Sequence, residues 1–219
     1  MNTQEATTAC RRFWARAPVS FGVSAISFFG TVIYLIGGWR PLQWLGLQSG
    51  DMSALLHWYR FVTHVFLQAS AFHWVWNSAL LVLVGMVIEK RIARLYIVSM
   101  IVASSVLGGV LFCIFSRPDS IAMGMGFVLN SYIGCLFACY LADKKHFQKP
   151  ERILTAVLII LKLVHLGVGL AWLTHGMNMN LLKWIVLLVA FLTSWRTYRL
   201  IEIRKANNGL QFISAPLSH

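Results

Sequence analysis

Long apolar stretches alternate with short basic segments along most of this chain. Six stretches carry almost no charged residue: 19–38, about 65–88, 95–116, 120–142, 153–176 and about 181–194. A helix of about 20 apolar residues crosses the hydrocarbon core of a bilayer and satisfies its own backbone hydrogen bonds there. The pattern therefore predicts an all-α membrane protein, a bundle of six transmembrane helices.

The basic residues between these stretches predict the orientation of the bundle. Most of them fall on one side of the six predicted helices, and only Arg40, Arg60, Arg117 and Lys183 fall on the other. The positive-inside rule then places both termini in the cytoplasm. We expect a basic cytoplasmic tail at 1–18, the membrane domain at 19–200 and a second cytoplasmic tail at 201–219. The expected location is the bacterial cytoplasmic (inner) membrane; an acid-poor tail with arginines leaves a mitochondrial address as the alternative.

Composition indicates which kinds of molecule the protein contacts. Hydrophobic residues make up 58% of the 219 residues and charged residues 12%, and the mean hydropathy is +0.68. The net charge of +12 lies in short runs beside apolar stretches, so it indicates topology and contact with lipid, and not nucleic-acid binding. The four cysteines show no paired spacing, so we expect no disulfide, no metal site and no cofactor.

The connection between the first two predicted helices, from Arg40 to about Thr63, is rich in Trp and Leu. Such a composition is unusual for a solvated linker and typical of a segment at the membrane interface. We expect this interfacial loop to lie on the outer side of the membrane.

The stretch from Trp58 to Leu95, WYRFVTHVFLQASAFHWVWNSALLVLVGMVIEKRIARL, resembles bacterial rhomboid intramembrane serine proteases. The resemblance rests on Arg60, Thr63, His64, His73, Asn77 and the run Glu89, Lys90, Arg91. It implies a six-helix rhomboid-like bundle in which His73 and Asn77 stand where the family stabilises the oxyanion of its tetrahedral intermediate. These two residues are four apart and share one face of a helix. Where the family has a further histidine this chain has Gln68, which can still donate a hydrogen bond.

The same resemblance shows that the catalytic pair is missing. The family carries its serine in a glycine-x-serine-glycine turn before the fourth helix. Here Gly124 and Gly126 are present, and Met125 or Gly126 occupies the serine position, depending on a one-residue gap. The family's histidine on the sixth helix has no match. Lys183 lies near that depth, and large residues replace the glycines that let the fourth and sixth helices approach.

We therefore interpret the chain as a rhomboid-like pseudoprotease that binds transmembrane segments of membrane-protein clients without cleaving them. The alternative is an active rhomboid-type endopeptidase with a relocated nucleophile, Ser131, and base, His165. Lys162 and His165 lie on one face of the fifth predicted helix and form a possible intramembrane polar site between the second and fifth helices. A lysine that reaches toward the cytoplasmic interface would explain Lys162 equally well. A small transporter that uses these two residues is a weaker alternative, because the sequence has no internal repeat.

Overall fold

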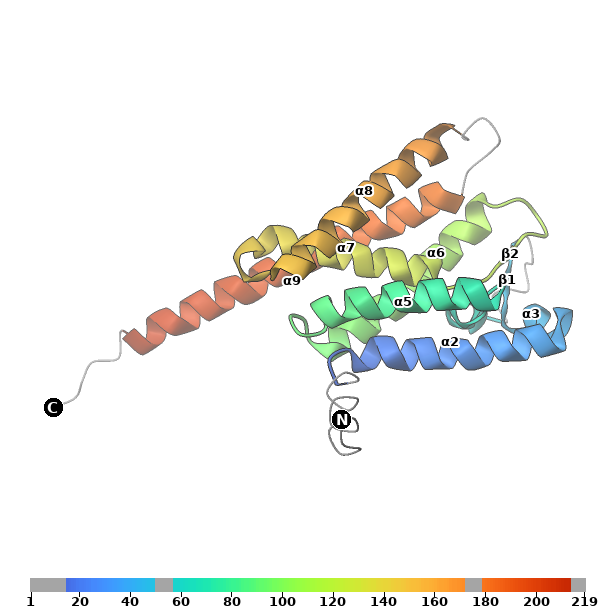
Figure 1. Cartoon of the computed structure of the whole chain (residues 1–219), viewed down its shortest axis with the longest axis horizontal. Coiled ribbons are helices and arrows are strands. Elements are labelled where there is room, and N and C mark those ends of the chain that lie inside the picture. Colours follow the sequence, from blue (N-terminus) through green and yellow to red (C-terminus); the bar gives the residue numbers. More distant parts are fainter. Residues whose placement is uncertain (1–14, 50–56, 172–178, 214–219) are drawn as a thin grey trace, which may run out of the picture.

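The computed structural model describes residues 15–49, 57–171 and 179–213, and most of them are helical (Figure 1). The long helices are α2 (Pro18–Gly37), α5 (Ala71–Ile88), α6 (Arg94–Phe115), α7 (Gly126–Ala142), α8 (Lys149–Ala171) and α9 (Met179–Ile213). The connections contain the short elements α3 (Trp39–Leu45), β1 (Leu47–Gln48), α4 (Arg60–Thr63), η2 (His64–Phe66), β2 (Ile121–Ala122) and η3 (Lys144–His146).

Three of the described helices, α2, α5 and α6, are long and apolar enough to cross a membrane. Their outer faces are apolar as well. On α6 the exposed residues Val98, Val102, Val106 and Val110 recur every four positions, so they form one row along the helix. An apolar face of this size is stable against lipid and unfavourable against water. The chain is thus an integral membrane protein.

The central helix is α7. It is a shorter apolar helix of 17 residues, and its residues from Phe127 to Leu136 are all buried. It packs against α5, α6, α8 and α9, and Figure 1 shows it (yellow) between α5 and the pair α8 and α9. Residues at the start of α7 are therefore placed by several neighbouring helices at once.

Helices α5 and α7 begin later than the apolar stretches 65–88 and 120–142 predict. Residues 60–66 form the separate turns α4 and η2, and α5 begins at Ala71, where the Ser70 hydroxyl accepts a hydrogen bond from the His73 backbone N–H at 3.1 Å. This is an ordinary serine N-cap. Before α7 the chain forms β2 and then passes through Gly124, whose φ of 99° is incompatible with a helix. A local cap and a local turn fix the starts of α5 and α7. A pattern of hydrophobic residues does not reveal either of them.

A short β-ribbon joins the two long connections at one end of the bundle. Leu47 pairs with Ala122 and Gln48 with Ile121 in antiparallel register. Ser49 extends the link, because its N–H donates to the Ser120 carbonyl at 2.9 Å. In the neighbouring part of the first connection, α3 leaves Trp39 and Trp44 exposed. The ribbon fixes the segment before α7 to the connection after α2.

The contact between α7 and α9 is close, although α9 carries large residues where the rhomboid pattern has glycines. Gly134 of α7 provides the space. A Cβ atom at Gly134 would lie 2.3 Å from the Leu187 carbonyl oxygen and 3.1 Å from the Phe191 nitrogen. The helix α9 also continues past the predicted apolar stretch to Ile213.

Candidate functional site

The turn before α7 is built by Gly124, Met125 and Gly126. The Gly124 N–H donates to the His64 carbonyl at 3.0 Å, so η2 holds the turn in place. Met125 is the residue preceding the helix and is fully buried. Gly126 is the first residue of α7, and of these two candidate nucleophile positions it is the one that faces a polar side chain from another helix.

That side chain is Lys183 of α9. A Cβ atom on Gly126 would lie 3.1 Å from the Lys183 Cε and 3.6 Å from its Nζ. The lysine thus lies over the N-terminus of α7. Electrostatic interaction also links Lys183 to His73 of α5 and to Lys162 of α8. Three basic side chains from three helices therefore meet near the start of α7.

Gln68, His73 and Asn77 border the same turn on its other side. A Cβ atom at Gly124 would lie 3.3 Å from the Gln68 Oε1 and 3.4 Å from the His73 Cε1. Asn77 donates to the Gln68 Oε1 at 3.0 Å, and Gln68 in turn donates to the Val65 carbonyl at 3.2 Å. Gln68 and Asn77 are thus bonded to each other, whereas no side-chain hydrogen bond is recorded for His73 within the described part of the chain.

Lys162 joins the site through a residue that sequence reasoning missed. Its Nζ donates to the Asn130 Oδ1 at 2.5 Å, and the Asn130 Nδ2 donates to the Gly126 carbonyl at 2.6 Å. Asn130 is one turn along α7 from Gly126, so Lys162 points toward the start of α7. The Lys162 side chain therefore points away from the end of the bundle at which α8 begins. The spacing of four places Gly126 and Asn130 on one face of α7, but no signal in the sequence joins Asn130 to Lys162.

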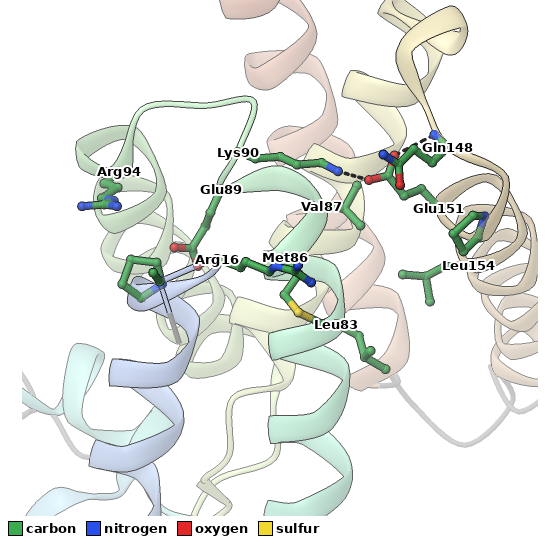
Figure 2. Close-up of a pocket in the computed structure, with 13 residues that line it drawn as sticks. Arg16, Leu83, Met86, Val87, Glu89, Lys90, Arg94, Gln148, Glu151 and Leu154 are labelled. Carbon is green, nitrogen blue, oxygen red and sulfur yellow. Dashed lines mark hydrogen bonds and ion pairs between the residues drawn. The ribbon is translucent and has the colours of Figure 1, made fainter. Parts of the chain in front are cut away.

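The residues of the glutamate-lysine-arginine run lie at the other end of the bundle and connect helices there. Glu89 accepts hydrogen bonds from the Val19 N–H at 3.0 Å and the Ser20 N–H at 2.8 Å, and so caps the start of α2. Lys90 and Arg91 both form ion pairs with Glu151 of α8. Figure 2 shows Glu89, Lys90 and Glu151 around a cavity of about 740 Å³ between the end of α5 and the start of α8.

The remaining predicted scaffold residues hold the first connection together. The Thr63 hydroxyl donates to the Leu45 carbonyl at 2.9 Å and so ties α4 to α3. The His64 Nδ1 lies 2.8 Å from the Arg60 carbonyl, which closes the turn between α4 and η2. Because the Gly124 N–H donates to the His64 carbonyl, these bonds also help to hold the turn before α7.

A comparison with protein-family models matches residues 55–198 to the rhomboid domain, which is most of the chain. The chain belongs to the rhomboid family. No curated protein matches it. The matched region begins in the first connection and ends in α9, so the whole site around Gly126 lies inside the rhomboid domain.

Within this rhomboid domain, Ser131 lies apart from the basic residues. Its hydroxyl donates to the Val128 carbonyl at 2.7 Å and to the Ser104 hydroxyl of α6 at 3.2 Å. It therefore points toward α6, whereas Lys183 approaches α7 from α9 and Lys162 from α8. His165 belongs to α8, but its side chain lies outside the described residues.

Proposed function

We propose that this rhomboid is a pseudoprotease that binds transmembrane segments of membrane-protein clients without hydrolysing them. It would act as an adaptor, chaperone or quality-control factor in the bacterial cytoplasmic membrane. In this proposal α2 and α5 to α9 all cross the bilayer, and both termini are cytoplasmic. The distribution of basic residues along the sequence supports this topology.

The observation that carries the proposal is the pairing of Gly126 with Lys183. In the rhomboid pattern Met125 or Gly126 stands at the position of the serine nucleophile, and Lys183 lies near the depth of the histidine base. Glycine has no side chain that can attack a carbonyl, and Met125 is an apolar, fully buried alternative. The lysine occupies the space beside Gly126 and approaches the position where a nucleophile would stand.

The scaffold that positions the site is retained even though the nucleophile is not. The His64 carbonyl still holds Gly124, and Gln68, His73 and Asn77 still line the turn. A site that binds a transmembrane segment needs polar groups inside the bundle that pair with polar groups of that segment. It needs no nucleophile.

A serine-reactive probe tests the loss of hydrolysis. We expect the purified protein in mild detergent to give no adduct with a fluorophosphonate, as read from intact mass and site mapping. An active rhomboid labelled in parallel is the positive control. A stoichiometric adduct on one serine, lost when that serine is replaced by alanine, would show a relocated catalytic centre; Ser131→Ala is the first such variant to make.

A further inference from the structure

Lys162 of α8 and Lys183 of α9, which lie near the start of α7, have no acidic partner among the described residues. Lys162 is bonded to the neutral Asn130, and Lys183 lies against Gly126 without an ion pair to any carboxylate that the structure describes. Each lysine is half-buried, and the two interact electrostatically. Two ammonium groups in a poorly solvated place repel each other, and burial of an unpaired charge is costly.

Three of the acidic residues whose side chains the structure describes are engaged elsewhere. Glu89 caps α2, Glu151 pairs with Lys90 and Arg91, and Asp143 pairs with His146 after the far end of α7. The end of α7 is about 24 Å from Gly126 at 1.5 Å per residue. Asp119 lies in the loop before β2. The three engaged carboxylates, Glu89, Asp143 and Glu151, thus lie at the opposite end of α7 from the lysines.

The N-terminus of α7 adds further positive potential at the same place. The first turn of a helix presents unpaired N–H groups and about half a positive charge, which favours an anion and disfavours a cation. Lys183 lies over this terminus. A helix end that already carries an ammonium group, with a second ammonium and His73 nearby, is electrostatically complementary to an anion.

We propose that Lys162 and Lys183 bind the carboxylate of an acidic residue in a client's transmembrane segment. This inference rests on the proposed function and names the class of client. An aspartate at the centre of a membrane helix costs about 2.5 to 3.5 kcal/mol on insertion scales. A helix with such a residue is unstable in lipid and gains most from an ammonium partner. Gly126 is partly exposed and carries no side chain, so a client can approach the backbone at the start of α7 beside Lys183.

Two synthetic transmembrane peptides, identical except for Glu or Gln at the central position, test this inference. Their binding to the full-length protein is measured by energy transfer in phosphatidylcholine vesicles. We expect the Glu peptide to bind at least about tenfold more tightly than the Gln peptide, as for one polar pair in a membrane. The double variant Lys162→Met, Lys183→Met is expected to bind both peptides alike. Lys149→Met, at the exposed start of α8, is the matched control and keeps the preference.

Other outcomes separate the inference from the function on which it rests. Equal binding of both peptides by the wild type overturns the carboxylate site but leaves client binding intact, whereas binding of neither peptide overturns both. A preference that survives in the double lysine variant also overturns the assignment. Asp51 lies outside the described residues; a preference that appears only in Asp51→Asn would assign the lysines to the chain's own carboxylate and would overturn their assignment to a client. Displacement of the Glu peptide by oleate would assign the site to lipid carboxylates instead.

Discussion

Replacement of Gly134 by leucine is expected to lower the free energy of unfolding by about 3 kcal/mol or more, because overpacking of a tight interface has this order of cost. A Cβ atom at this position would lie 2.3 Å from the Leu187 backbone oxygen. Backbone cannot rotate away as a flexible side chain can, so α7 and α9 must separate. Unfolding by SDS in mixed micelles, followed by circular dichroism, measures the loss.

Gly22→Leu is the matched control for this prediction. Gly22 is an exposed helical glycine of α2, and a Cβ atom there would meet nothing within 4 Å. We expect Gly22→Leu to retain the wild-type stability. Equal stability of the two leucine variants would contradict the close contact between α7 and α9, and with it the placement of Lys183 over Gly126.

The protein is expected to lose stability as the pH falls from about 6.5 to about 4, because of His64. Burial lowers the pKa of His64 from 6.5 to about 4, although the backbone hydrogen bond to Arg60 opposes the shift. His64 lies in η2, before the membrane-spanning helix α5. In this pH window the unfolded chain binds a proton that the folded protein does not, so protonation favours unfolding. A shift of this size contributes up to about 3 kcal/mol.

The variant His64→Phe tests the origin of this pH dependence. It removes the titrating group and the bond to the Arg60 carbonyl, so its stability is lower at pH 7 but falls less between pH 6.5 and 4. Gly22→Leu changes no titratable group and is the control; it is expected to retain the wild-type slope. Identical slopes for wild type and His64→Phe would exclude His64 as the group responsible.

Hydrophobic periodicity and family resemblance predicted the helical membrane fold and the rhomboid domain, because both depend on patterns that are local in sequence. The starts of α5 and α7 were not predicted, since they depend on the Ser70 cap and on the positive φ of Gly124. The close approach of α7 and α9 was also missed. The family pattern places the small residues on the sixth helix, whereas here Gly134 of the opposite helix provides the space.

The same distinction holds for the candidate site: resemblance to the family identified its motif residues, but not the contacts between helices far apart in sequence. His73, Asn77, Gln68 and the turn residues were identified by resemblance, and the structure places them around Gly124. The bond between Lys162 and Asn130 joins residues 32 positions apart, and no local pattern predicts it. The hypothesis of a polar site between the second and fifth helices stays a prediction, and the structure adds that Lys162 contacts Asn130 of α7.

Photocrosslinking to a client tests binding without cleavage most directly. Benzoylphenylalanine replaces Met123, beside Gly124, and in a control protein it replaces Phe29, an exposed residue of α2. Each protein is coexpressed with a reporter whose transmembrane helix carries a central glutamate. The account predicts a crosslink to the uncleaved reporter from position 123 and little from position 29. A cleaved reporter fragment, or equal crosslinking from both positions, would contradict it.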